Sequence, residues 1–123
     1  GPAMFGIIQS NAPSLAYDPQ QAVSESEAGR ITLIDIREPG EVKSTGKAKG
    51  ALHVPLAALR MKADPASPEQ LPEFRAGKPL VLYCASGGRS QMAARMLRQM
   101  GLEDVYNLGG LGHWQMAGGK IGR

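Results

Sequence analysis

Residues 31–37 read Ile-Thr-Leu-Ile-Asp-Ile-Arg, and apolar or β-branched side chains occupy nearly every position of this run. A strand with one face in water alternates apolar and polar side chains, whereas a strand buried on both faces does not. Strands of the second kind occur mainly in parallel sheets that helices cover on both faces. Residues 80–83, Leu-Val-Leu-Tyr, form another apolar run. The two runs predict a parallel sheet inside an α/β domain.

Helical segments are expected between the strands. The sequence predicts strands over residues 14–17, 31–37, 51–54, 79–83 and 105–108. It predicts helices over 19–28, from 38, over 56–61, after a cap at 67–70, over 88–100 and over 109–117, with a loop at 46–50. Strands and helices that alternate in this way over one short chain favour a central, mostly parallel five-stranded sheet with helices on both faces.

Length and charge limit the classes of protein to which the chain can belong. The 123 residues fit one domain, expected over residues 14–121, after a tag remnant at 1–4 and a loose lead-in at 5–13. The net charge of +3 is dispersed, which argues against a nucleic-acid-binding protein. No run reaches the ~18 apolar residues of a membrane span. A single cysteine forms no internal disulfide, so a cytoplasmic location is expected.

Cys84 is that single cysteine, and it stands between the apolar run at 80–83 and a predicted helix. A thiol at the start of a helix meets unpaired backbone N–H groups and the positive end of the helix dipole. Both favour the thiolate, which is the nucleophilic form of cysteine. Ligands of parallel α/β sheets bind at the carboxyl ends of the strands, where Cys84 is expected to lie. Cys84 is therefore predicted to be a catalytic nucleophile.

The segment after Cys84 reads Ala85-Ser86-Gly87-Gly88-Arg89-Ser90. Its two glycines let successive N–H groups turn toward one centre, which would bind an anion or an anionic sulfur. The two serines add hydroxyl donors. Arg89 suits an oxyanion such as a sulfonate or a phosphate, and its alternative role is to tie the loop to a carboxylate. One cysteine and two separated histidines make no metal site, and no cofactor is expected.

Four motifs in order along the chain resemble the rhodanese-type sulfurtransferases. Residues 84–90 resemble the active-site loop of that family, and residues 33–38 resemble its Asp-x-Arg-Glu strand. Residues 50–56 resemble its Gly-Ala-x-x-x-Pro segment, and residues 105–110 with Trp114 resemble its last strand and helix. The resemblance spans about residues 14–121 and implies a rhodanese-like fold. Ala85 departs from the family, because this position is often basic there, and 46–48 replaces a Gly-His-Ile triplet.

The resemblance implies a double-displacement reaction. The Cys84 thiolate would attack the outer sulfur of thiosulfate or of another persulfide donor and become a persulfide, with ping-pong kinetics. Cyanide, a cellular thiol or a protein acceptor would then remove the sulfur. The expected roles are nucleophile for Cys84, substrate binding for residues 85–90, and support of the loop for Asp35 and Arg37. Because no second cysteine exists to resolve the persulfide, the acceptor must be external.

Three other functions remain open on the sequence. The first is a persulfide carrier for a protein acceptor in a sulfur relay. The second is a cysteine phosphatase or arsenate reductase, although those enzymes have a longer spacing between cysteine and arginine than the four residues found here. The third is a non-catalytic recognition module, against which Cys84 argues.

Other conspicuous side chains have plainer interpretations. Glu38 and Glu41 are expected to be acids stabilised by a helix N-terminus. His53 and His113 are expected on a strand and on a helix face. Trp114 and the methionines of the helix at 88–100 are expected in the core, namely Met92, Met96 and Met100.

Overall fold

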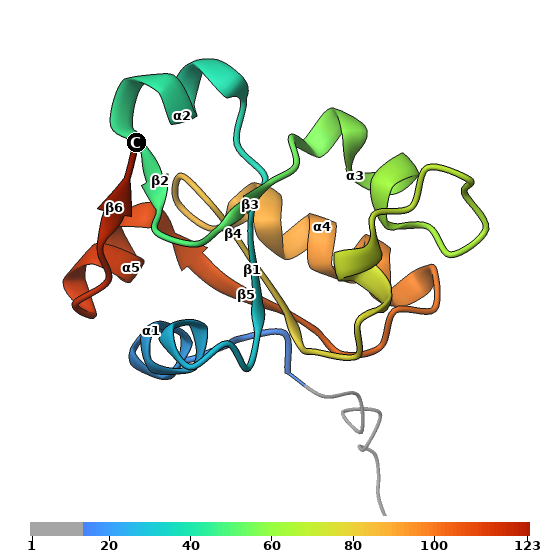
Figure 1. The fold of residues 1–123 in the computed structure, drawn as a ribbon, viewed down its shortest axis with the longest axis horizontal. Coiled ribbons are helices and arrows are strands. Elements are labelled where there is room, and N and C mark those ends of the chain that lie inside the picture. The colour runs from blue at the N-terminus through green and yellow to red at the C-terminus, as the bar shows by residue number, and fades with distance from the viewer. Residues whose placement is uncertain (1–13) are drawn as a thin grey trace, which may run out of the picture.

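The structure, a computed structural model, describes residues 14–123, so the expectations for residues 1–4 and 5–13 lie outside the described residues. Four parallel strands form its main sheet, in the order β3-β1-β4-β5 (Figure 1). They are β1 (Thr32–Asp35), β3 (Leu52–His53), β4 (Leu80–Cys84) and β5 (Val105–Gly110). All five side chains of β4 are buried. The parallel sheet predicted from the two apolar runs is confirmed.

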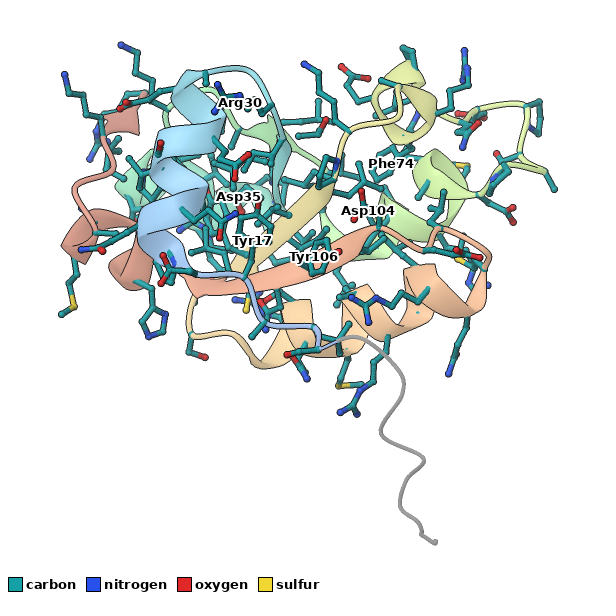
Figure 2. The ribbon with its side chains drawn as sticks, turned by 90° about the horizontal axis from the view of Figure 1, so that it is seen from below. Tyr17, Arg30, Asp35, Phe74, Asp104 and Tyr106 are labelled. Atoms are coloured by element: carbon teal, nitrogen blue, oxygen red, sulfur yellow. The ribbon has the colours of Figure 1, made fainter. Side chains whose placement is uncertain are left out.

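A single parallel bridge between Ala16 and Asn107 extends this sheet beyond β5, where the sequence predicts an edge strand. The rings of Tyr17 and Tyr106 pack there with their centroids 5.3 Å apart (Figure 2). The fifth strand position is thus reduced to one bridge and one aromatic contact.

Helices cover both faces of the sheet. They are α1 (Pro19–Glu27), α2 (Pro39–Thr45), α3 (Leu56–Ala63), α4 (Gly88–Gln99) and α5 (Leu111–Met116). Alternate residues of β4 point into two separate clusters: Leu82 and Cys84 pack with α3 and α4, and Val81 and Tyr83 pack with α1 and α5. The sheet therefore separates two apolar cores, as the fold predicted from the sequence requires. None of the helices in the described part is long and apolar enough to cross a membrane.

Helix ends follow the signals in the sequence. The Asp18 carboxylate accepts a hydrogen bond of 2.9 Å from the Gln21 N–H, and Pro19 is the first residue of α1. Beyond α4, Gly101 has φ +102°, a left-handed conformation that glycine adopts easily and that ends the helix. The predicted limits of both helices are confirmed within two residues.

Three local predictions are wrong. The α-helix expected after Ser67 is replaced by turns and a 3₁₀ helix at Pro72–Arg75, because three prolines in this region remove backbone donors. The loop predicted at 46–50 contains β2 (Lys47–Ala48), which pairs antiparallel with β6 (Ile121–Gly122). Met92 is 72% exposed rather than in the core. The buried face of α4 is centred on Ala93, Ala94 and Leu97, and Met92 lies about 150° around the helix from that centre.

Candidate active site

Cys84 is the last residue of β4, and α4 begins four residues later at Gly88. In the sheet Cys84 lies opposite Gly110 at the end of β5. Residues 84–90, which we call the Cys84 loop, thus occupy the carboxyl edge of the parallel sheet, where the sequence predicts the site (Figure 1). The Cys84 side chain is only 1% exposed, while Ala85 and Ser86 beside it are exposed. The thiol therefore lies directly beneath the surface.

Hydrogen-bond donors converge on the sulfur of Cys84. The Gly87 N–H donates to Sγ at 3.0 Å, and the Ser90 hydroxyl donates to it at 3.3 Å. Burial raises the pKa of the Cys84 thiol, but hydrogen bonds from the Ser90 hydroxyl and from the N–H groups of Ser90, Gly87 and Ser86 more than offset this, so the net pKa is lowered. The arrangement stabilises a thiolate without a neighbouring base.

Glycines allow the loop to pack against the end of β5. Gly87 has φ +114°, a left-handed conformation, and this turn aims its N–H at the sulfur. A Cβ on Gly110 would overlap the carbonyl oxygen of Ala85. A side chain at position 110 would therefore push the Cys84 loop away from β5.

Side chains of β5 and α5 brace the same region. The Asn107 amide donates to the Gly87 carbonyl at 3.1 Å, and its oxygen accepts from the Gly109 N–H at 2.9 Å. The Nδ1 atom of His113 accepts a hydrogen bond of 2.9 Å from the Gly110 N–H. The backbone on both sides of the sulfur is therefore held by hydrogen bonds, which preorganises the groups that surround Sγ.

Arg89 is bound to a carboxylate of another element. Its Nη1 and Nη2 atoms donate to the two oxygens of Glu41 at 2.8 and 2.9 Å, and both side chains are about one-third exposed. The hydrogen bond from Arg89 is the main cause that lowers the pKa of Glu41 to about 2. The pKa of Arg89 is raised chiefly by the same hydrogen bond and further by Cys84. The guanidinium thus bridges α2 and the Cys84 loop.

Asp35 and Arg37 form a buried ion pair at the end of β1. The Arg37 Nη2 atom donates to Asp35 Oδ2 at 2.8 Å and to the Gly46 carbonyl at 2.8 Å. The Tyr83 hydroxyl donates to Asp35 Oδ2 at 2.6 Å and accepts from the Ala48 N–H at 2.9 Å. The Asp35 side chain lies in the interior of the molecule (Figure 2). This network fastens α2 and β2 to the sheet beside the Cys84 loop.

A protein-family model described as "Rhodanese-like domain" matches residues 18–117, which is most of the chain. The chain belongs to the rhodanese-like family.

Similar proteins occur in several bacteria and in human. This rhodanese-like chain is 41% identical over 93 residues to the uncharacterized protein YqhL of Bacillus subtilis, covering 75% of this chain and 64% of that protein. It is 39% identical over 116 residues to the uncharacterized protein slr1261 of Synechocystis, covering 94% and 58%. It is 34% identical over 101 residues to thiosulfate sulfurtransferase GlpE of Shewanella oneidensis, covering 79% and 88%. The chain thus spans less than two-thirds of the length of the first two relatives.

Two solved structures resemble the rhodanese-like chain closely. One is a Rhodopseudomonas palustris protein of unknown function, described as a possible tyrosine phosphatase, with a TM-score of 0.78, 35% identity, and coverage of 92% of this chain and 86% of that one. The other is the human single-domain sulfurtransferase TSTD1, with a TM-score of 0.64, 27% identity, and coverage of 85% and 96%.

The site of this rhodanese-like domain contains residues that sequence reasoning missed. The sequence indicates Glu41 only as an acid at a helix start, and it predicts no role for Asn107 or Tyr83. Glu41 had a recognisable signal, since it follows Glu38 by three residues, and its carboxylate accepts from the Glu38 N–H at 2.9 Å as in a capping box. Its second partner, Arg89, is 48 residues away. No local pattern gives that contact.

The structure separates the predicted site residues into two groups. Residues 84–90 lie on one loop, whereas the Asp35–Arg37 pair contacts Tyr83, which precedes that loop. His53 donates from Nε2 to the Arg37 carbonyl at 2.8 Å, in keeping with a structural interpretation. Within residues 14–123, no cluster of three or more His, Cys, Asp or Glu side chains could hold a metal ion.

Proposed function

We propose that this rhodanese-like domain transfers a sulfane sulfur through a persulfide on Cys84. The observation that carries the proposal is the set of donors around Sγ, with the Gly87 N–H at 3.0 Å and the Ser90 hydroxyl at 3.3 Å. They lower the pKa of the Cys84 thiol despite its burial. Such a thiolate attacks without a general base.

In the first step the Cys84 thiolate attacks the outer sulfur of the donor. With thiosulfate, the S–S bond of the donor breaks, sulfite leaves with the bonding electron pair, and Cys84 becomes a persulfide anion. With a hydropersulfide RSSH, the corresponding thiol leaves and carries the proton. The backbone N–H groups of residues 86, 87 and 90 are proposed to hold the anionic sulfur, and Arg89 to brace the loop or bind the sulfonate of the donor.

In the second step an external nucleophile attacks the outer sulfur and regenerates the Cys84 thiolate. Cyanide would give thiocyanate, and a thiol would give a new persulfide. Cys84 is the only cysteine of the 123 residues, so no other thiol among these residues can accept the sulfur. A protein acceptor fits the same chemistry and would make this domain a persulfide carrier in a sulfur relay. We also propose a cytoplasmic location, where thiol acceptors are abundant.

The relatives support this assignment through their names. The Shewanella protein is named a thiosulfate sulfurtransferase, and the human structure is named a single-domain sulfurtransferase. The step from their activity to this chain is part of the proposal.

The test is to incubate the protein with thiosulfate, and separately with glutathione persulfide, and to measure its intact mass. We expect a gain of about 32 Da, one sulfur atom, that is absent from Cys84→Ser and is reversed by cyanide. Cys84→Ser keeps a side chain of similar size, and its circular dichroism spectrum, compared with that of the wild type, shows whether the variant is folded. Absence of an adduct with both donors in folded wild-type protein would overturn the proposal.

A second candidate function, phosphatase or arsenate reductase, is favoured by one comparison, the solved structure described as a possible tyrosine phosphatase. The Cys84 loop argues against it, because four residues separate Cys84 from Arg89 and the Arg89 fork is occupied by Glu41. Hydrolysis of p-nitrophenyl phosphate, compared between the wild type and Cys84→Ser, distinguishes the two functions. We expect no Cys84-dependent hydrolysis.

A further inference from the structure

The guanidinium of Arg89 is the one cationic side chain that residues 84–90 contribute. Its Nη1 and Nη2 atoms form the fork that binds two oxygens of a carboxylate, phosphate or sulfonate. In this structure both atoms donate to Glu41, at 2.8 and 2.9 Å. The fork that would hold the sulfonate of thiosulfate is therefore already occupied by a carboxylate of the same chain.

A second hydrogen bond, within α2, also fixes the position of the Glu41 carboxylate. Its Oε2 atom also accepts the Glu38 N–H at 2.9 Å, so the first turn of α2 orients the carboxylate. A carboxylate held by its own helix competes with a dissolved anion at a high effective concentration. A donor sulfonate would have to displace it and leave its charge without the arginine.

The charges around the sulfur also disfavour thiosulfate as the donor. A Cys84 thiolate, the Arg89 guanidinium and the Glu41 carboxylate sum to a net charge of −1. Ala85, at the position next to Cys84, contributes no charge. Thiosulfate carries two negative charges next to the sulfur that reacts and is repelled by such a group, whereas the reacting SSH end of a hydropersulfide is uncharged and the carboxylates of a donor such as glutathione persulfide lie farther from the site. Backbone N–H groups can still hold a single transferred sulfur.

We propose that Glu41 is a specificity-determining residue which, by occupying the fork of Arg89, makes hydropersulfides the preferred sulfur donors over thiosulfate. This inference rests on the proposed sulfur transfer through Cys84. The favoured step is attack of the Cys84 thiolate on the terminal sulfur of RSSH. The S–S bond of the donor breaks, RSH leaves with the proton, and the persulfide anion stays on Cys84. No external oxidant or reductant is needed.

The experiment compares the wild type with Glu41→Gln and with Glu38→Gln. The control removes the same charge from the same end of α2, and the Glu38 side chain is exposed. The rate of persulfide formation on Cys84 is measured by rapid-quench intact mass with thiosulfate and with glutathione persulfide. We expect the wild type to prefer glutathione persulfide. We expect Glu41→Gln to gain about tenfold in kcat/KM for thiosulfate and to change less than about threefold with glutathione persulfide. Glu38→Gln should resemble the wild type.

Ionic strength gives an independent measurement. Salt screens charge repulsion, so wild-type reaction with thiosulfate should accelerate between low and moderate salt, and Glu41→Gln should lose most of this acceleration. A merely structural Glu41 would not alter the salt dependence for one donor alone. An equal loss of rate with both donors in Glu41→Gln, or a wild type that prefers thiosulfate, would overturn the inference and leave the proposed function intact. Failure of both donors to modify the wild type would overturn the proposed function itself.

Discussion

Arg89 donates from both terminal nitrogens to both carboxylate oxygens of Glu41, at 2.8 and 2.9 Å, and this ion pair joins the Cys84 loop to α2. Paired, parallel hydrogen bonds of this kind fix the plane of the guanidinium as well as its position. The orientation of the Arg89 guanidinium is therefore set by a carboxylate 48 residues earlier in the chain.

The same ion pair predicts that the stability of the folded protein depends on pH. The pKa of Glu41 falls from its ordinary value of 4.5 to about 2 in the folded protein. A lowered folded pKa contributes stability that is present above pH 4.5 and is lost as the pH falls toward 2. Urea denaturation followed between these pH values should show a smaller loss of stability in Glu41→Gln than in the wild type. Glu38→Gln should retain the wild-type slope.

The hydroxyl of Ser90 is expected to control the reactivity of Cys84. It is buried and lies 3.3 Å from Sγ, so Ser90→Ala removes a donor that stabilises the thiolate and raises the pKa of Cys84. A hydrogen bond to a charged group contributes about 1.5 kcal/mol or more, so alkylation by iodoacetamide at neutral pH should slow about tenfold. The pH profile of alkylation should also move to higher pH.

Ser86→Ala is the matched control for that measurement. Ser86 is exposed, and it is the backbone N–H of this residue, unchanged by the substitution, that lowers the pKa of Cys84. Equal alkylation profiles for the two variants would contradict the role given to the Ser90 hydroxyl.

The close approach of Gly110 to Ala85 predicts that a side chain at position 110 impairs sulfur transfer. Gly110→Ala places a Cβ on the Ala85 carbonyl and displaces the Cys84 loop. A displacement of about 1 Å at a reacting group costs on the order of 100-fold in rate, so sulfur transfer should fall by about that factor. Gly112→Ala is the control, because a Cβ there meets no atom within 4 Å. Similar rates in the two variants would show that the close approach does not matter.

The buried ion pair of Asp35 and Arg37 is expected to stabilise the fold, so breaking it should lower the free energy of unfolding. Asp35→Asn leaves the 3% exposed Arg37 without its counter-charge, which costs about 3 to 5 kcal/mol of unfolding free energy. Chemical denaturation measures this loss, and Glu38→Gln on the surface should change the unfolding free energy little. In the fraction that remains folded, Cys84 should react with iodoacetamide at the wild-type rate. A slowed alkylation with unchanged stability would instead place Asp35 in the active site.

The sequence predicted the features that depend on neighbouring residues. The β-branched run of β1, the cap at Asp18 and the glycine turn after Cys84 each have a local physical cause, and each is present in the structure. The family resemblance was likewise carried by short motifs, and the match to the rhodanese-like model confirms it.

Contacts between distant segments could not be predicted in the same way. The strands β2 and β6 have two residues each, too few for any pattern, and they pair across most of the chain. The sequence does not identify Glu41 as the carboxylate that binds Arg89, because an acid at the start of a helix has the same sequence signal whether or not an arginine lies nearby. Met92 lies outside the core because Ala93, Ala94 and Leu97 form the buried face of α4. The other two methionines of this helix, Met96 and Met100, pack partly buried against the core as predicted.

Ser90 has one hydroxyl hydrogen and three acceptors at the same distance of 3.3 Å, namely Sγ of Cys84 and the carbonyl oxygens of Gly87 and Gly109. In the proposed persulfide the negative charge lies on the outer sulfur instead of Sγ, and the Ser90 hydroxyl can rotate toward a carbonyl without losing a partner. Rotation about one torsion angle of Ser90 is enough to move its hydroxyl from the sulfur to either carbonyl. The hydroxyl therefore keeps a hydrogen-bond partner whether or not Sγ of Cys84 carries the negative charge.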